Sequence, residues 1–186
     1  MITHVVGIDP SVAGTGIADA RGALATVGGG SGDGRLVTIH HAVHSMTTAP
    51  AEGLLAVVED LPYHARSAGV TGMAQGVVRL ALLEAEIRYV LVIPSVLKMY
   101  ATGKGNATKP DMRMALYRRT GADLRDDNQC DAAWLRYMGL DAAGLAGAVE
   151  MPKANREALA KVTWPVGIAE MARRVLDPLV IEAGGG

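Results

Sequence analysis

The sequence predicts an α/β domain in which a mixed sheet of five strands is flanked by helices. Three observations lead to this fold class. First, short apolar runs of strand length end at proline or at an acid. Second, the strands near the start of the chain are separated only by glycine-containing turns. Third, a segment of helical length separates the later strands. Strands joined by tight turns pair antiparallel and strands joined through a helix pair parallel, so a mixed sheet is expected.

The first part of the chain is expected to form an antiparallel meander. An apolar strand over Val5–Ile8 ends at an Asp-Pro pair, and an extended segment follows over Gly14–Ala18. The glycine-rich stretch Gly28–Gly34 predicts a flexible hairpin tip, and Arg35–His41 predicts the third strand.

The remaining elements alternate between strand and helix. An apolar run over Leu54–Leu61 predicts a fourth strand, and Tyr89–Ile93 predicts a fifth. Val70–Arg88 has helical length and is apolar on more than one face, so we expect it to be buried on two sides, against the sheet and against a partner chain. Further helices are expected over Pro110–Thr120, from Asp126 to about Leu140, and over Asn155–Val162.

Composition excludes several classes of protein. The 186 residues are 49% hydrophobic and 20% charged, which is typical of a globular domain and excludes disordered, collagen-like and coiled-coil chains. Phe is absent and Cys130 is the single cysteine, so the core must be aliphatic and no internal disulfide can form. The sequence shows neither a signal peptide nor an apolar stretch of ~20 residues, so we expect a cytoplasmic protein without a membrane partner.

Four acids are candidates for chemistry. Asp9 ends the first predicted strand and Glu59 ends the fourth, while Asp127 and Asp131 are spaced i,i+4 on one face of a predicted helix. Carboxylates gathered at the ends of parallel strands repel one another unless cations hold them, and oxygen ligands suit Mg²⁺. Two such ions ~3.5–4 Å apart can stabilise both the attacking and the leaving oxygen of a phosphodiester. The residues therefore indicate a magnesium-dependent nuclease.

The net charge of −1 conceals a basic segment. Residues 98–125 contain seven basic side chains and two acids, 7 − 2 = +5. A basic segment near the acids would hold a phosphate backbone. We expect DNA contacts from Lys98, Lys104, Lys109 and Arg113.

Several motifs together resemble RuvC-type Holliday junction resolvases, which have the ribonuclease H-like fold. Gly7-Ile8-Asp9-Pro10-Ser11 with Thr15-Gly16 is similar to their opening hairpin, and Val57-Val58-Glu59 to their second acidic strand. Asp131-Ala132-Ala133 is similar to the end of their acid set, and Pro94–Lys98 with Lys109 to the segment that carries two functional lysines. The resemblance covers roughly residues 4–140 and is closest to phage versions, which implies a bacterial cell or a phage-infected host.

The resemblance implies roles for individual residues. Asp9, Glu59 and Asp131 would be metal ligands and catalytic, and Lys98 and Lys109 would contact the scissile phosphate. The cofactor would be two Mg²⁺ ions in each active site, with Mn²⁺ as a substitute. The partner would be a four-way DNA junction, cut by a homodimer through paired symmetric nicks, with the helix Val70–Arg88 as the candidate interface.

The sequence departs from the family pattern in two places. Where the family usually has Asp or His three residues before the last acid, this chain has Asn128, so either Asp127 or Asn128 is expected as the fourth ligand. Few residues separate the third and fourth predicted strands, so the family's helix there is expected to be shortened or lost, with the C-terminal 40 residues covering that face of the sheet. We expect a nuclease domain over residues 1–165 and a C-terminal extension over 166–186 whose last three glycines are disordered.

Other functions fit parts of the same pattern. A nuclease for forks, flaps or RNA would use the same catalytic residues. An actin-like nucleotide-binding protein would use Gly7–Asp9 and Gly14–Gly16 as a phosphate hairpin, but it needs two such halves. Asn128 also fits a catalytically inactive junction-binding module, and Asp126 or Asp127 could serve only as a helix cap.

Overall fold

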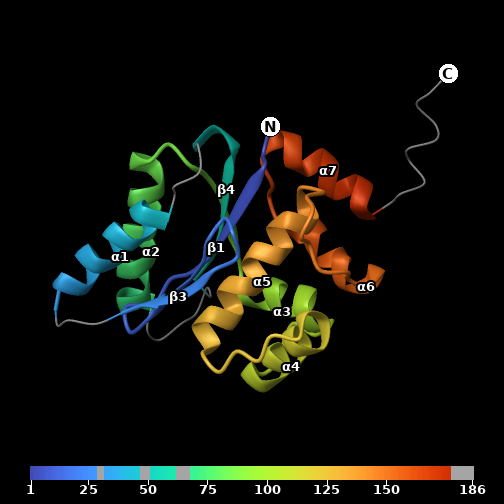
Figure 1. Ribbon diagram of the computed structural model, residues 1–186, viewed down its shortest axis with the longest axis horizontal. Helices are drawn as coiled ribbons and strands as arrows, with labels where there is room; N and C mark the ends of the chain where they lie inside the picture. The colour runs from blue at the N-terminus through green and yellow to red at the C-terminus, as the bar shows by residue number, and fades with distance from the viewer. Residues whose placement is uncertain (29–31, 47–50, 62–67, 177–186) are drawn as a thin grey trace.

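A five-stranded mixed sheet organises the molecule (Figure 1). The computed structural model describes residues 1–28, 32–46, 51–61 and 68–176. The strand order is β3-β2-β1-β4-β5, in which the first three strands pair antiparallel and β4 and β5 extend the sheet in parallel from β1. The strands are β1 His4–Asp9, β2 Thr15–Ala18, β3 Leu24–Val27, β4 Leu54–Glu59 and β5 Arg88–Val92.

Helices cover both faces of this sheet. Helices α1 and α2 lie on one face, and α5 crosses the other face with α3, α4, α6 and α7 packed around it (Figure 1). The helices are α1 Gly34–Met46, α2 Ala68–Glu84, α3 Pro94–Thr102, α4 Lys109–Thr120, α5 Asp127–Ala142, α6 Lys153–Arg156 and α7 Val166–Leu176, with short 3₁₀ turns η1 Ala51–Gly53 and η2 Glu157–Lys161. Within the described residues, no helix is long and apolar enough to cross a membrane.

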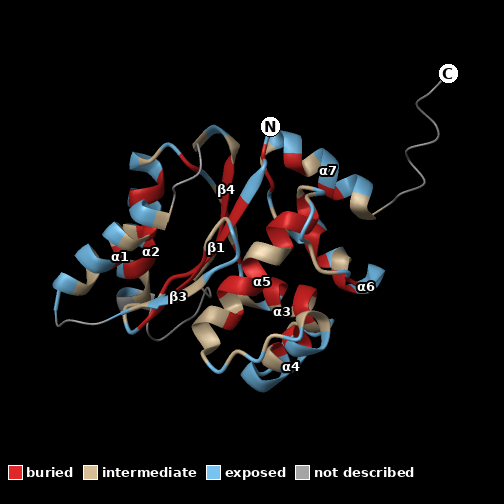
Figure 2. Cartoon of the chain, viewed as in Figure 1, coloured by how far each residue is buried: buried red, intermediate tan, exposed pale blue. Residues whose placement is uncertain are grey.

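The central strands are buried on both sides, so the sheet separates two apolar cores (Figure 2). In β4, Leu55 and Val57 belong to the core under α5, whereas Leu54, Ala56 and Val58 belong to the core under α1 and α2. This alternation is the period of two residues along a strand. It fixes the face toward which each strand-end acid points.

Trp134 joins α5 to α4. Its indole N–H donates a hydrogen bond to the carbonyl oxygen of Met112 at 3.1 Å, and its ring lies edge-on to Tyr100 and Tyr137. Burying the whole indole is tolerated because its one polar group is satisfied. The contact fixes the first turns of α4 against α5.

The predicted strand over Arg35–His41 is wrong, because these residues lie in helix α1. The third strand is Leu24–Val27, and the hairpin that leads to it closes at Asp19, whose carboxylate accepts hydrogen bonds from the N–H groups of Arg21 and Ala23. The turn comes before the glycine-rich stretch, where residues 29–31 lie outside the described residues. Ile39 and Val43, spaced i,i+4, are the buried side of α1.

The helix before the fourth strand, which was expected to be shortened or lost, is therefore present. Helix α1 occupies that place and, with α2, covers the face that the C-terminal 40 residues were expected to cover (Figure 1). The C-terminal segment packs instead on the α5 side. Ile168 and Ala172 of α7 belong to the core there, and the last three glycines lie outside the described residues.

The other predicted strands and helices agree with the structure apart from their boundaries. Helix α2 ends before the predicted Arg88, since Glu86 adopts a left-handed conformation with φ of 54° and β5 then begins. Helix α3 was not predicted, because a proline such as Pro94 can mark either the end of a strand or the first turn of a helix.

Candidate active site

Asp9 and Glu59 stand side by side at the carboxyl edge of the sheet. Strands β1 and β4 are parallel neighbours in which Ile8 is level with Val58, so the next residues end the two strands together. By the alternation along each strand, both acids point toward α5. The Glu59 carboxyl donates a hydrogen bond to the Asp9 carboxylate.

Two glycines bring α5 close enough to add a third acid. A β-carbon on Gly7 of β1 would lie 2.1 Å from the carbonyl oxygen of Ala132, and one on Gly16 of β2 would lie 2.0 Å from that of Asn128. The helix therefore rests directly on the backbone of the sheet, as only glycine permits. Asp131 lies between these two points of contact; its charge acts on Glu59, and the charge of Asp9 acts on Asp131.

The start of α5 is fixed by a cap. Asp126 accepts hydrogen bonds from the N–H groups of Asn128 at 2.9 Å and Gln129 at 3.3 Å, and from the hydroxyl of Thr26 on β3. The hydrogen bond from Thr26 and those from the backbone lower the pKa of Asp126. The cap role considered for Asp126 or Asp127 belongs to Asp126.

The three acids hold more negative charge than their surroundings accommodate. Burial raises the pKa of Asp9 to about 6, although the hydrogen bond from Glu59 lowers it. Burial and then the charge of Asp9 raise the pKa of Asp131 to about 7. The pKa of Glu59 lies well above its usual range because of burial and then the charges of Asp9 and Asp131. Without added cations, the acids compensate by binding protons.

Two lysines lie near these acids. Lys98 on α3 lowers the pKa of both Glu59 and Asp131, and Lys109 at the start of α4 lowers that of Asp9 and Asp131. The Nζ atom of Lys109 is 3.0 Å from Oδ2 of Asp127, and this contact raises the pKa of the lysine. Both are among the candidate catalytic residues of the sequence.

The two candidates for a fourth ligand lie on different sides of the α5 terminus. Asp127 pairs with Lys109, and its charge raises the pKa of Asp131. The side-chain nitrogen of Asn128 lies 3.2 Å from where a β-carbon on Gly14 would be, so Asn128 faces the first hairpin. The choice between Asp127 and Asn128 stays a prediction.

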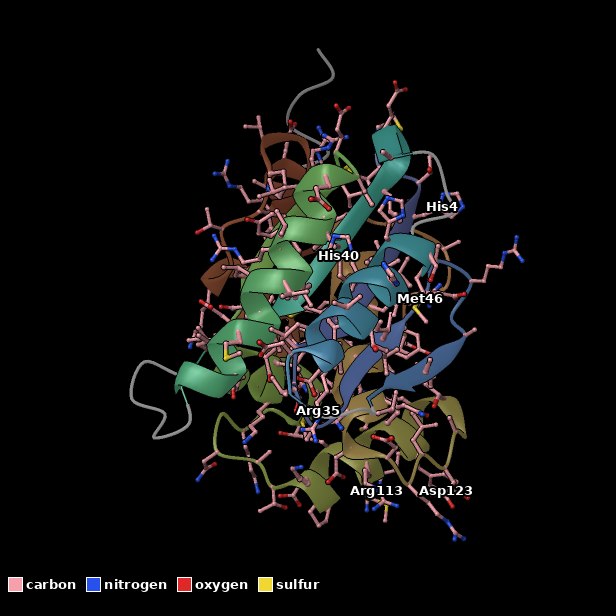
Figure 3. The ribbon with its side chains drawn as sticks, turned by 90° about the vertical axis from the view of Figure 1, so that its left-hand side faces the viewer. His4, Arg35, His40, Met46, Arg113 and Asp123 are labelled. Atoms are coloured by element: carbon pink, nitrogen blue, oxygen red, sulfur yellow. The ribbon has the colours of Figure 1, made fainter. Side chains whose placement is uncertain are left out.

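The other two predicted DNA contacts are Lys104, in the loop between α3 and α4, and Arg113, on α4. Lys104 lines a shallow hollow with Thr102, Arg118 and Arg119. The Nε atom of Arg113 donates to the carbonyl oxygen of Leu124 at 2.6 Å, and Figure 3 shows Arg113 beside Asp123 at the lower end of the molecule. Asp111 lines the same hollow as Lys104.

The donor set suits a hard divalent cation. Among the described residues, no three His, Cys, Asp or Glu side chains are arranged so that they could hold one metal ion together. The carboxylates of Asp9, Glu59 and Asp131 nonetheless form a partly buried group of oxygen donors, whose pKa values are raised first by desolvation and, for Glu59 and Asp131, then by neighbouring carboxylate charge. A divalent cation would supply positive charge in place of bound protons.

Comparison with known proteins identifies the fold. No protein-family model matches the sequence. The structure of RuvC from Thermus thermophilus matches 80% of this chain and 99% of its own, with a TM-score of 0.59 and 23% sequence identity. The chain has the RuvC fold.

A second structure, of T. thermophilus RuvC in complex with a Holliday junction substrate, matches 81% of this chain and 99% of its own, with a TM-score of 0.57 and 21% identity. The ribonuclease H-like fold and the likeness to RuvC, both expected from the motifs, are thereby confirmed. Roughly a fifth of the present chain lies beyond the match to RuvC.

Sequence reasoning did not identify the side chains that support the acids. Gln75 on α2 is buried and hydrogen-bonded at the end of β4, next to Glu59. The one amide side chain of a mainly apolar helix could have indicated such a role. Nothing in the local sequence indicates that Thr26 bonds to Asp126.

Proposed function

We propose that this protein is a metal-dependent endonuclease that resolves four-way DNA junctions. The observation that carries the proposal is that Asp9, Glu59 and Asp131, from three separate elements, share one partly buried site beside Lys98 and Lys109. The RuvC fold supports the same function, since one of the matched RuvC structures holds a Holliday junction.

The acids would act as metal ligands. Asp9, Glu59 and Asp131, with Asp127 or Asn128, would hold two Mg²⁺ or Mn²⁺ ions, whose chemistry is to activate water and neutralise the leaving oxygen. The hydrogen-bonded pair of Asp9 and Glu59 would lose its proton on loading. Lys98 and Lys109 would orient the scissile phosphate and offset its charge.

A homodimer would place two such sites on one junction. Helix α2 leaves large apolar side chains uncovered, with Met73 46%, Leu80 50% and Leu83 61% exposed. Their spacing of i, i+7 and i+10 puts them on one side of the helix. Figure 3 shows α2 on the outer face of the molecule, beside α1. A second copy packed there would relate the two sites by a two-fold axis, as symmetric nicking requires.

Cleavage of defined substrates tests the proposal. Junction, fork, flap, duplex and RNA substrates should be incubated with Mg²⁺, Mn²⁺ or EDTA, and the nicks mapped on each strand. We expect metal-dependent, paired nicks on opposing strands of the junction. Cleavage of forks or flaps in preference to junctions would favour the alternative of a nuclease for other branched DNA, which the same active site supports, and preferred cleavage of RNA would favour a ribonuclease. Junction binding without cleavage in either metal would indicate an inactive binding module.

A further inference from the structure

Gln75 is a buried polar residue on α2, the helix that covers the face of the sheet opposite to Asp9, Glu59 and Asp131. Its side chain is 5% exposed, on the face of α2 that packs against the sheet. Its Nε2 atom donates hydrogen bonds to Oδ1 of Asp60 at 2.8 Å and to the carbonyl oxygen of Glu59 at 3.3 Å. A buried amide is retained at little cost only when it is satisfied in this way.

Asp60 is held in place from several directions. Its Oδ1 atom also accepts the N–H of Leu61 at 2.8 Å, and its own N–H donates to the carbonyl oxygen of Val92 at 2.8 Å. The second contact continues the pairing of β4 with β5 by one residue. The Gln75 amide, which comes from α2, adds a side-chain hydrogen bond that holds Asp60 at the end of β4.

Glu59 and Asp60 are adjacent acids with opposite orientations. Since successive side chains of a strand point to opposite faces, Glu59 points to α5 and the other acids while Asp60 points to α2. If the backbone rotated at the end of β4, Asp60 would point to α5 and Glu59 would point to α2. It would bring a different carboxylate into a site where Asp9 and Asp131 are already crowded with negative charge.

We infer that Gln75 is a positioning residue that holds Asp60 on the α2 side of the sheet and thereby keeps Glu59 directed at Asp9 and Asp131. The inference rests on the proposed function, because it concerns the ligands of the proposed metal site. Gln75 touches neither substrate nor metal in this role. Residues of this kind, which support metal ligands from outside, typically change metal affinity 10–100-fold when they are replaced.

Metal binding without DNA provides the test. Mn²⁺ affinity of the full chain should be measured by calorimetry and by the electron paramagnetic resonance signal of free Mn²⁺. We expect Gln75→Met, which keeps the size and removes both hydrogen bonds, to weaken binding about 10-fold or more. Arg79→Met, one turn further along α2, removes the hydrogen bond from its Nε atom to the Tyr89 hydroxyl and should leave Mn²⁺ binding unchanged.

An exchanged pair separates positioning from general packing. Gln75→Glu alone places two carboxylates against each other and should weaken Mn²⁺ binding strongly. Adding Asp60→Asn restores one amide and one carboxylate with their places exchanged, so the double variant should recover most of the affinity. Wild-type affinity in Gln75→Met would overturn the inference.

The outcomes also separate this inference from the proposed function. If the wild-type chain binds no Mn²⁺, the proposed metal-dependent nuclease fails and the inference fails with it. If the wild type binds and the variants bind equally well, only the role of Gln75 fails. Should Gln75→Met not fold, the comparison of Gln75→Glu with the double variant decides, and equal affinities there overturn the inference.

Discussion

Asp9 is the least exposed acid of the site, and it interacts with both of the other acids. It accepts the hydrogen bond of Glu59, and its charge acts on both Glu59 and Asp131. Its place was predictable, because an acid that directly ends a short buried strand has a fixed orientation. The supporting side chains were not predictable, since Gln75 and Thr26 reach the site only through tertiary packing.

Replacing Asp9 tests the chemistry at this scale. Asp9→Asn keeps the shape and removes the charge that would bind metal, so we expect cleavage of a junction to fall by at least about 10²–10³-fold while junction binding in a gel-shift assay is retained. Asp33→Asn, an exposed acid at the start of the α1 region, is the matched control and should cut normally. Near wild-type cleavage by Asp9→Asn would contradict the proposed mechanism.

The raised pKa values predict how the stability of the metal-free protein depends on pH. Between the ordinary carboxyl pKa of 3.8 and the folded values of about 6 for Asp9 and about 7 for Asp131, the folded state binds more protons than the unfolded state. Stability should therefore fall as pH rises from 4 to 7, by about 1.4 kcal/mol for each pH unit that separates the unfolded pKa of a group from its folded pKa. The melting temperature in EDTA should be lower at pH 8 than at pH 5.

Added Mg²⁺ should reverse that loss, and more so at pH 8 than at pH 5. Asp131→Asn should flatten the pH dependence, because it removes one of the titrating groups. A melting temperature in EDTA that does not change between pH 5 and pH 8 would contradict the charge balance described for the three acids.

At the scale of elements, α5 was predicted best from the sequence, and α1, which was predicted as a strand, was predicted worst. The Asp-rich start and apolar run of α5 are local signals, and the helix begins where they indicate. Helix α1 has a weakly apolar, partly β-branched sequence after a glycine-rich stretch, and only its packing on α2 and the sheet determines that it is helical. The close approach of α5 to β1 likewise appears only in three dimensions.

Gly7→Ala tests that close approach. The added methyl group would lie 2.1 Å from a backbone oxygen of α5, which cannot move without displacing Asp131. We expect a loss of about 1–3 kcal/mol or more in unfolding free energy and a loss of cleavage. Gly34→Ala at the start of α1, where a β-carbon meets nothing within 4 Å, should change neither denaturant unfolding nor cleavage.

At the scale of the whole molecule, a buried polar cluster ties the C-terminal part to the candidate active site. Asp141 of α5 is 3% exposed and accepts hydrogen bonds from Arg156 of α6 at 3.0 Å and from the Tyr100 hydroxyl of α3 at 3.1 Å. Asn155 donates to the carbonyl oxygen of Tyr100 at 2.8 Å. The cluster holds together the helices that carry Lys98 and Asp131.

Arg156→Met would leave the Asp141 carboxylate buried without its ion-pair partner. We expect this change to cost about 3–5 kcal/mol of unfolding free energy, measured by urea denaturation. Arg174→Met removes an ion pair with Glu170 whose partners are 53% and 67% exposed, so it should change stability little. Equal effects of the two substitutions would show that the buried pair does not support the fold.

The proposed dimer is tested by a charge on the uncovered side of α2. Leu80→Glu should convert a dimer into a monomer in sedimentation experiments, and junction cleavage should then yield single, unpaired nicks. Val37→Glu places the same charge on α1 at a residue that is 56% exposed and should leave the dimer intact. A wild-type chain that sediments as a monomer with and without DNA would contradict the proposed dimer.

The indole of Trp134 gives the molecule an internal optical reporter. The chain has two tryptophans and no phenylalanine, and the second, Trp164, lies near the C-terminal helix α7. In a Trp164→Tyr background, emission would come from one buried indole three residues after Asp131 and hydrogen-bonded to the backbone of the helix that begins with Lys109. Stopped-flow fluorescence could then follow, in real time, how α4 and α5 respond when metal or DNA is added.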